Sequence, residues 1–199
     1  IMSLYNIVKN DIIKVNIGID VTSIGPSAFL SCSNLTDICF VNIDDSSLNT
    51  IGDSAFESSA LKSITIPKTV TTIGASAFRL CSDLTDICFV NITDSSLNTI
   101  GVLAFESSAL KSITIPKTVT SIGGAAFYDC SNLTDISFDD IANSSLITIG
   151  EQAFYQTALT SITIPKTVTY ISDEIFYGCS SLTDICFVNI DDSSLVTIG

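Results

Sequence analysis

The apolar positions of this chain repeat at a fixed spacing. An Ile-Gly dipeptide begins at residues 24, 51, 73, 100, 122, 149 and 198, and Ile-Ser stands at 171, so the spacings alternate between 27 and 22 residues. The repeating unit is therefore a pair of coils that totals 49 residues, and ALKSITIPKTVT occurs letter for letter at 60–71 and 109–120. A period of this kind is typical of stacked repeat architectures, and it predicts a solenoid.

Each coil opens with a strand pattern. Leu61, Ile64 and Ile66 begin a short coil, and their spacing ends in a period of two with β-branched residues, which favours a strand. Pro67 leaves no room for a helix at this point. The long coil that opens at Leu84 has the same pattern. One such coil cannot bury its apolar edge alone, so neighbouring coils are expected to stack.

These residues resemble a known family. The segment LKSITIPKTVTTIGASAFRLC at 61–81 has the pattern Leu-x-x-Ile-x-Ile-Pro-x-x-Val-x-x-Ile-Gly-x-x-Ala-Phe-x-x-Cys, which resembles the BspA-like, or treponemal-type, leucine-rich repeats. The resemblance implies a leucine-rich repeat solenoid, α/β by family class but largely β. Parallel strands would lie on the concave face, with short helical or extended turns on the convex face. About eight coils of alternating 23 and 26 residues are expected, opening at 12, 35, 61, 84, 110, 133, 159 and 182.

The pattern covers residues 1–199 as a single leucine-rich repeat domain, with 1–20 as a degenerate first coil. The sequence ends on SSLVTIG in mid-coil, and its first residues, IMSLYNIV, are apolar. Solenoids normally finish with capping repeats that have a polar outer face. We therefore expect a fragment of a longer array, or a unit that stacks end to end.

The polarity of the strands predicts which side chains face outward. In LTDICF, Ile38 and Phe40 face the core, so Asp37 and Cys39 point to the concave face. The two predicted outward rows are Asp37, Ser63, Asp86, Ser112, Asp135, Ser161 and Asp184, and Cys39, Thr65, Cys88, Thr114, Ser137, Thr163 and Cys186. They form a small, polar, mildly acidic face without aromatic anchors, which is either a protein-binding face or a solvated one.

The seven cysteines fall into two registers. Cys32, Cys81, Cys130 and Cys179 lie three residues after the Phe of the turn, and Cys39, Cys88 and Cys186 lie in strands. Equivalent cysteines are two coils apart, roughly 10 Å, which exceeds the reach of a disulfide bond. We expect free thiols, with the turn cysteines buried as small hydrophobes in a ladder. The spacing does not suit a zinc site, and the chain has no His.

Charge excludes several classes of function. A net charge of −13 with eight Lys and Arg argues against a nucleic-acid partner, and no apolar run is long enough for membrane insertion of this segment. The acidic loops at Asp44, Asp45, Asp94, Asp191 and Asp192 form an edge stripe, which is interpreted as solubilising charge, with a calcium site as the alternative. No metal site or cofactor is predicted.

Nothing in the sequence resembles a catalytic set, since it contains neither a His for base chemistry nor a Gly-rich phosphate loop. We therefore do not expect an enzyme. Glycosylation sequons stand at Asn34, Asn91, Asn132 and Asn143. They matter only in a eukaryotic secretory pathway.

Two functions remain open. The resemblance implies an adhesin-like interaction protein, extracellular or on the cell surface, that presents a curved repeat surface to host or matrix proteins. The alternative is a structural repeat protein that self-associates end to end into a filament. The uniform copying of surface residues such as Lys62 and Lys111 favours the alternative, although recent duplication would produce the same copying.

Overall fold

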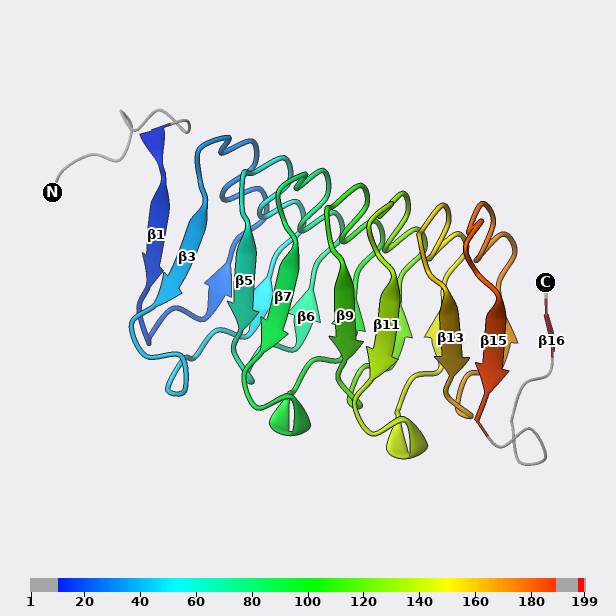
Figure 1. The fold of residues 1–199 in the computed structure, drawn as a ribbon. Helices are drawn as coiled ribbons and strands as arrows, with labels where there is room; N and C mark the ends of the chain where they lie inside the picture. The colour runs from blue at the N-terminus through cyan, green and yellow to red at the C-terminus, as the bar shows by residue number, and fades with distance from the viewer. Residues whose placement is uncertain (1–10, 189–196, 199) are drawn as a thin grey trace, which may run out of the picture.

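The structure is a computed structural model that describes residues 11–188 and 197–198, and these form a stack of coils with one four-residue strand on the same side of each coil (Figure 1). Each strand starts two residues after a coil start predicted above, which confirms the predicted solenoid. The strands are β1 (Lys14–Ile17), β3 (Asp37–Phe40), β5 (Ser63–Ile66), β7 (Asp86–Phe89), β9 (Ser112–Ile115), β11 (Asp135–Phe138), β13 (Ser161–Ile164) and β15 (Asp184–Phe187). We call this side the long-strand face.

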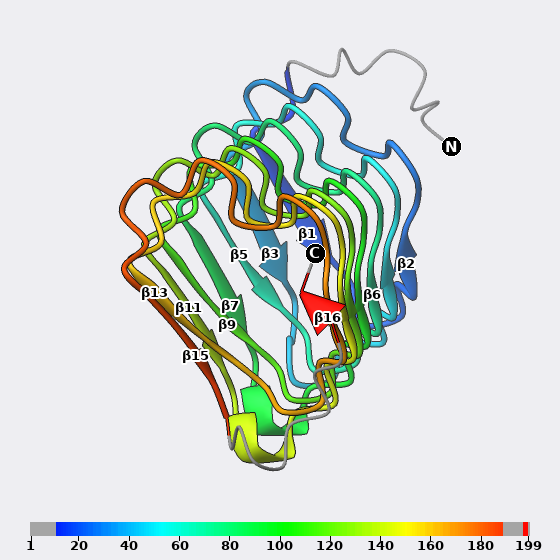
Figure 2. The ribbon, with the colours of Figure 1, turned by 90° about the vertical axis from the view of Figure 1, so that its right-hand side faces the viewer.

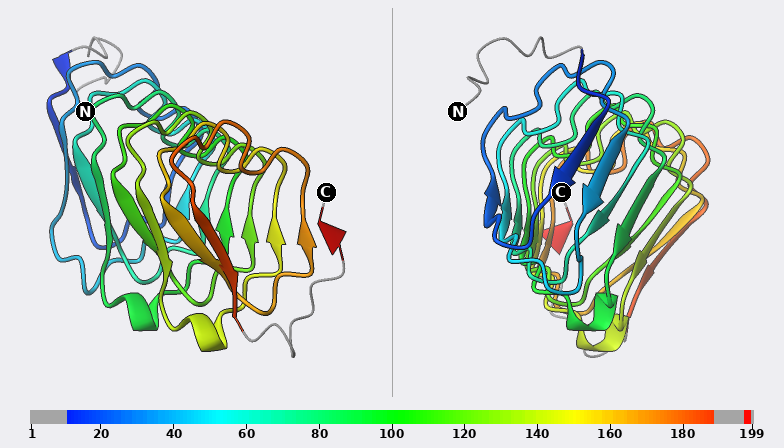
Figure 3. Two further views of the ribbon diagram at one scale, coloured as in Figure 1. Left: turned by 45° about the vertical axis from the view of Figure 1, so that its right-hand side comes forward. Right: turned by 90° about the vertical axis from the view of Figure 1, so that its left-hand side faces the viewer.

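The opposite side of each coil carries a two-residue strand. These strands are β2 (Ser23–Ile24), β4 (Thr50–Ile51), β6 (Thr72–Ile73), β8 (Thr99–Ile100), β10 (Ser121–Ile122), β12 (Thr148–Ile149), β14 (Tyr170–Ile171) and β16 (Thr197–Ile198). They form one parallel eight-stranded sheet in the order β16-β14-β12-β10-β8-β6-β4-β2. Figures 2 and 3 show the two rows of strands as opposite walls of the stack.

The long-strand face is not one continuous sheet. The long strands pair as four separate two-stranded parallel sheets, β1–β3, β5–β7, β9–β11 and β13–β15. In β5–β7, for example, Ser63 lies opposite Asp86 and Thr65 lies opposite Cys88. The ladder is broken between β3 and β5, between β7 and β9, and between β11 and β13. Each break follows a 26-residue coil. The two predicted outward rows therefore lie on one face, but the strands that carry them are hydrogen-bonded only in pairs and not across the whole face.

Three coil pairs make up the middle of the chain. We call residues 35–83 the first pair, 84–132 the second pair and 133–181 the third pair. The long coils of the second and third pairs add a short 3-10 turn at their lower edge, η3 (Ile92–Asp94) and η4 (Ile141–Asn143). These turns form the bulges at the lower edge in Figure 1.

A column of phenylalanines runs through the core. Neighbouring rings stack with centroids 5.3 to 5.8 Å apart along Phe29, Phe56, Phe78, Phe105, Phe127, Phe154 and Phe176. The five central rings, from Phe56 to Phe154, are fully buried. Burial of such a side chain stabilises the fold by about 1.5–3 kcal/mol. Each of the first seven coils contributes one ring, so stability is shared along the stack.

The Gly of the Ile-Gly dipeptide is required by close approach between coils. A Cβ atom on Gly101 would lie 2.5 Å from the carbonyl carbon of Gly74, far inside normal contact distance. The final described coil departs from this rule, because Ser172 replaces Gly and its Oγ donates a hydrogen bond to the carbonyl of Ile149 at 2.9 Å. The repeated dipeptide therefore indicates that successive coils pack closely on this wall.

The upper turns, which run from each two-residue strand to the next long strand, are not helical in the part of the chain that the structure describes. The residues two before and two after the core Phe have left-handed backbone conformations, as at Ser76 (φ 55°) and Leu80 (φ 56°) around Phe78. Their amides donate to the next coil, from Ser76 to the carbonyl of Val102 and from Leu80 to that of Glu106, both at 2.8 Å. The turn conformation is therefore held by the neighbouring coil, since these residue types rarely adopt it alone.

The predicted features at the two ends have only partial counterparts in the structure. β1 and the buried Ile17 belong to the degenerate first coil, but residues 1–10 lie outside the described residues. The same holds for the acidic loop at 191–192 and for most of the final SSLVTIG segment. Fragment length and end-to-end stacking stay predictions.

Candidate functional site

The fourteen residues of the two predicted rows lie on the outside of the long-strand face. In β5 the exposed Ser63 and Thr65 alternate with the buried Ile64 and Ile66. Twelve of the fourteen are exposed, and the other two, Cys39 and Ser137, are half-buried. The predicted orientation is therefore correct, whereas binding by these rows stays a prediction.

A cleft opens in this face where β11 and β13 fail to pair. It has a volume of about 270 Å³ and is lined by residues 135–138 of β11, Ile141 of η4 and residues 161–163 of β13. Ile136 and Ile162 are buried and form its apolar floor. The break thus brings together four residues of the predicted rows, Asp135, Ser137, Ser161 and Thr163.

The rim of the cleft offers hydroxyl groups and one carboxylate. The hydroxyls of Ser137 and Thr114, in neighbouring strands, are hydrogen-bonded at 2.9 Å. Asp135 is exposed, and it is the one charged residue of the lining. Among residues 11–188 and 197–198, no group of three or more His, Cys, Asp and Glu side chains could hold a metal ion. The chemistry that these groups support is recognition by hydrogen bonds, one negative charge and apolar contact.

The turn cysteines are structural. Cys81 and Cys130 are buried, and the thiol of Cys81 donates to the carbonyl of Phe56 at 3.1 Å. Burial raises the pKa of each of these two thiols to about 11, which keeps them protonated and unreactive at neutral pH. All seven cysteines lie in the described residues, and no disulfide bond joins them.

The expected cysteine ladder is a mixed column. Cys81 lies 3.5 Å from the hydroxyl of Ser59, and Cys130 lies 3.4 Å from that of Ser108. The long coils therefore place a hydroxyl where the short coils place a thiol. The strand cysteines differ, since Cys88 and Cys186 are exposed.

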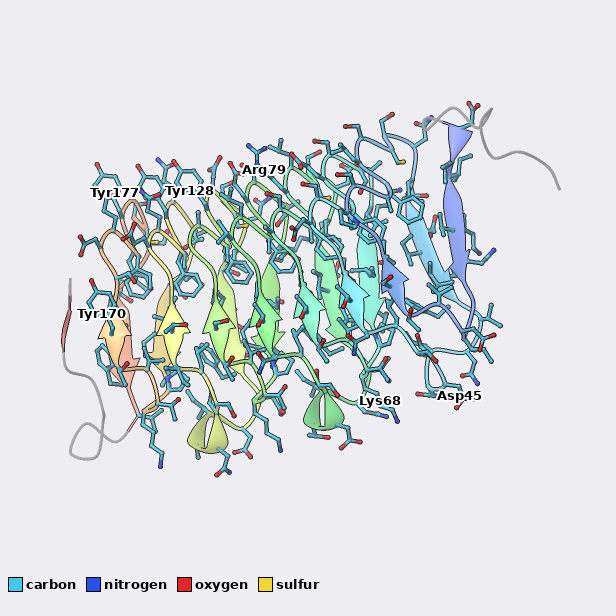
Figure 4. All side chains as sticks on the ribbon, turned by 180° about the vertical axis from the view of Figure 1, so that it is seen from behind. Asp45, Lys68, Arg79, Tyr128, Tyr170 and Tyr177 are labelled. Atoms are coloured by element: carbon cyan, nitrogen blue, oxygen red, sulfur yellow. The ribbon has the colours of Figure 1, made fainter. Side chains whose placement is uncertain are left out.

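A row of side chains that was not predicted from the sequence lies on the upper edge. We call it the post-Phe row because each residue follows a core Phe. The row reads Leu30, Glu57, Arg79, Glu106, Tyr128, Tyr155 and Tyr177. Its signal was available in the sequence, because a Tyr follows the Phe in three successive coils. Figure 4 shows Arg79, Tyr128 and Tyr177 along this edge, whereas Tyr170 lies lower, on β14.

The two halves of the post-Phe row are held by different forces. Arg79 bridges two carboxylates, with its Nη1 3.0 Å from Glu57 and its Nε donating to Glu106. The hydrogen bond to Glu106 contributes most to the raised pKa of Arg79. Tyr128 and Tyr155 instead stack with centroids 4.5 Å apart, and Tyr155 and Tyr177 with centroids 5.0 Å apart. Tyr177 is 60% exposed, so the row supplies the aromatic surface that the long-strand face lacks.

The acidic loops lie at the lower edge. Asp44, Asp45 and Asp94 are exposed, and the Asn42 amide donates to Asp45 at 2.6 Å. Figure 4 shows Asp45 and Lys68 at this edge. These loops do not gather into a cation cage in the described part of the chain. The four sequon residues, Asn34, Asn91, Asn132 and Asn143, are exposed.

A parallel solenoid in which Leu-x-x-Ile-x-Ile strands form one wall defines a leucine-rich repeat protein. A sequence profile of the BspA type leucine-rich repeat region, in 6 copies, matches residues 5–134 and 98–198. This chain belongs to the BspA-type leucine-rich repeat family. No curated protein matches it.

Several solved structures are similar to this chain. A leucine-rich repeat protein from Bacteroides ovatus is 25% identical, with a TM-score of 0.59 over 96% of this chain and 63% of its own. The pneumococcal vaccine antigen PcpA is 21% identical, with a TM-score of 0.66 over 94% of this chain and 50% of its own. The leucine-rich repeat protein of T. pallidum is 22% identical, with a TM-score of 0.62 over 93% of this chain and 78% of its own. This chain thus spans less than two thirds of the first two proteins.

The described residues contain no helix with the length and apolar character that crossing a membrane requires.

Proposed function

We propose that this protein is a non-enzymatic interaction protein, secreted or on the cell surface, whose long-strand face binds a protein ligand such as a host or matrix protein. The observation that carries the proposal is the cleft between β11 and β13, which gathers four predicted face residues over an apolar floor. Protein recognition sites commonly combine a desolvated apolar centre with a polar rim. The cleft offers this combination on a wall that is otherwise small and polar.

The pattern of sequence change supports the same surface. The third pair keeps most buried residues of the second pair, including a fully buried Phe in each long coil, at Phe105 and Phe154, while Ala126 becomes Ile175 and Ser108 becomes Thr157. It changes exposed and half-buried positions, such as Cys88 to Ser137 and Lys111 to Thr160. Most of the changes lie at the surface, which is what selection for recognition would produce.

Matched substitutions test the proposed face. Thr163→Trp fills the cleft, and Thr65→Trp makes the same change on β5 in the first pair. Both positions are exposed, so both variants should fold. Binding to a panel of purified extracellular matrix proteins is measured by surface plasmon resonance. We expect Thr163→Trp to weaken binding at least tenfold and Thr65→Trp to change it less than twofold, whereas equal effects, or no binding by the panel, would contradict the proposal.

The location requires a separate measurement. A membrane-impermeant amine-reactive biotin reagent is applied to intact cells that produce the protein, since Lys62 and Lys111 are exposed. Labelling of the protein on intact cells, or its recovery from the medium, is expected. Protein that becomes labelled only after the cells are lysed would exclude the surface or secreted location.

A further inference from the structure

We propose that the cleft between β11 and β13 receives a lysine or arginine side chain of the protein partner. This inference rests on the proposed function and adds the chemistry of the ligand. Three features carry it: an unengaged carboxylate, the loss of a lysine that the other breaks have, and an apolar floor suited to an alkyl stem.

The carboxylate of Asp135 differs from its equivalents in other coils. Asp37 and Asp86 each accept a hydrogen bond from the preceding threonine at 2.5 Å, and Asp184 accepts the same bond at 2.7 Å. In the third pair, Thr134 lies 3.3 Å from the carbonyl of Lys111, a contact that its equivalents Thr85 and Thr183 also make, but it donates no hydrogen bond to Asp135. Within the described residues no hydrogen bond or ion pair engages the Asp135 carboxylate. It therefore remains available to a ligand, as a charge at the mouth of the cleft.

The break at β11 and β13 also lacks a cation that the other breaks carry. Lys62 immediately precedes β5 and Lys111 immediately precedes β9, and both are exposed. The equivalent residue before β13 is Thr160. At the first two breaks, a lysine of this chain therefore stands one residue before the strand. At the third break that position has no lysine, and in our proposal the ligand supplies the positive charge.

The floor and size of the cleft suit one long side chain. Ile136 and Ile162 form the floor, with the half-buried Phe138 and Ile141 beside them. A volume of 270 Å³ is slightly below the range of about 300–1,000 Å³ that small-molecule sites occupy. Lys and Arg side chains place an alkyl stem on apolar surface while their charged head stays at the rim.

The surroundings attract a basic partner. Between residues 123 and 188, Asp or Glu stands at 129, 135, 139, 140, 151, 173, 174 and 184, and Lys166 is the one Lys or Arg. Two lysines of the preceding coil lie nearby: Lys111, whose carbonyl accepts from the Thr134 amide, and Lys117, which lies 4.0 Å from Asp140. Acidic groups still outnumber the basic ones. Lys166 follows Pro165 and lies after the end of β13, away from the start of the strand where Asp135 and Ser161 lie. A region of one charge sign raises the encounter rate with ligands of the opposite sign.

Titration with single side-chain probes tests the inference directly. Backbone amide shifts of the isotope-labelled protein are followed by NMR as N-acetyl-lysine methylamide, its arginine counterpart, the uncharged norleucine counterpart and the glutamate counterpart are added. The lysine and arginine probes should shift amides in 135–138 and 161–163, and the other two should not. Equal shifts with norleucine would overturn the charge requirement, and equal lysine shifts at β3 and β5 would show general acidity rather than a site.

Two variants and a matched control complete the test. Asp135→Asn removes the charge without changing shape, and Thr160→Lys restores the residue that the first two pairs carry. Each should weaken lysine-probe binding about tenfold, because Asp135→Asn removes the charged acceptor and Thr160→Lys places a competing ammonium group beside the cleft. Asp86→Asn makes the same change at another break and should leave binding within twofold. Unchanged thermal melting shows that the folds are intact, and binding that persists in Asp135→Asn and Thr160→Lys would refute the inference.

The inference and the proposed function can fail separately. If Thr163→Trp abolishes binding to a matrix protein while Asp135→Asn and Thr160→Lys bind it like the wild type, the binding face stands and the basic side chain does not. If the panel shows no ligand, the NMR titration still decides the chemistry of the cleft. Spermidine that bound more than tenfold tighter than the lysine probe would assign the cleft to a free polyamine and overturn the assignment to a protein side chain.

Discussion

The second and third coil pairs fold alike but present different surfaces. Both keep long strands of the same length, a fully buried Phe in the long coil and a break in the long-strand face. At the surface, Lys111 and Glu106 of the second pair become Thr160 and Tyr155 of the third. The second pair, by contrast, copies the first at most positions, including these two.

This difference separates the requirements of the fold from those of the surface. Stacking needs a Phe, a close-packed Ile-Gly and inward Ile residues in each coil, and all three pairs meet that need almost uniformly. The tyrosine stack needs residues that the first pair lacks. The cleft lining differs from its first-pair equivalent at one position, where Ser137 replaces Cys39, and Thr160 replaces Lys62 beside it. Apart from Tyr128 of the second pair, the third pair therefore carries the features that fit recognition, and the first two pairs serve as the scaffold.

The largest expected effect tests the shared core. Phe105→Ala and Phe154→Ala remove equivalent fully buried rings, so each should lower the free energy of unfolding by about 3–5 kcal/mol. Urea denaturation of the two variants measures this. A loss in Phe154→Ala of less than half that in Phe105→Ala would show that the third pair does not share the core of the second.

A smaller effect tests the close approach between coils. Gly101→Ala forces a Cβ against the backbone of Gly74 and should cost about 3 kcal/mol. Gly124 is the matched control, because its Cβ would meet only the backbone of Glu151, with the carbonyl oxygen at 3.4 Å and the nitrogen at 3.9 Å. Gly124→Ala should leave stability unchanged or raise it by roughly 0.5 kcal/mol. Similar melting temperatures for the two variants would contradict the account of the Ile-Gly repeat.

Salt dependence separates the two halves of the post-Phe row. Tyr155→Ala removes two ring contacts and should cost about 1–2 kcal/mol at any salt concentration. Arg79→Met removes partly exposed ion pairs and should cost about 1 kcal/mol or less at low salt, falling toward zero in 1 M salt. Denaturation at two salt concentrations distinguishes them. A salt-dependent cost for Tyr155→Ala would show that charge, not stacking, holds the third pair.

The smallest effect concerns the mixed cysteine column. Cys130→Ser should cost less than about 1 kcal/mol at pH 7, because the long coils already carry Ser59 and Ser108 at this position and a hydroxyl can donate to the Phe105 carbonyl. Burial raises the pKa of the Cys130 thiol from 9.0 to about 11, so the folded protein keeps a proton that the unfolded chain loses. This contribution is present below pH 9 and is lost as pH rises to about 11. The wild type should therefore lose more stability than Cys130→Ser in this range, and equal losses would contradict the buried thiol.

Most of the fold could be predicted from the sequence because its signals are local. Leu61, Ile64 and Ile66 face the core as expected, and β5 ends at Ile66, immediately before Pro67. The outward orientation of the rows follows from the same alternation. The left-handed turn residues were not predictable in this way, since Ser76 and Leu80 hold that conformation only through hydrogen bonds to the next coil.

The candidate site could be predicted only in part. Alternation identified Asp135 and Ser161 as outward residues, but not that β11 and β13 are unpaired. Whether two neighbouring long strands pair depends on the path of the 26-residue coil between them, and no local sequence pattern specifies that path. The tyrosine stack could have been predicted, because a Tyr follows the core Phe in three successive coils. The unengaged Asp135 carboxylate could not have been predicted, because Asp135 differs from Asp86 only in the hydrogen bond from the preceding threonine.

The central claim is that the third pair carries the binding surface on a scaffold shared by all three. One exchange tests it most directly. In one chain, two outward-facing third-pair residues of the long-strand face take their second-pair identities, Ser137→Cys and Thr160→Lys together. The comparison chain carries the reciprocal changes Cys88→Ser and Lys111→Thr. Binding of the matrix ligand by surface plasmon resonance should fall at least tenfold in the first chain and not fall in the second. Undiminished binding by the first chain, with its melting temperature intact, would contradict the account.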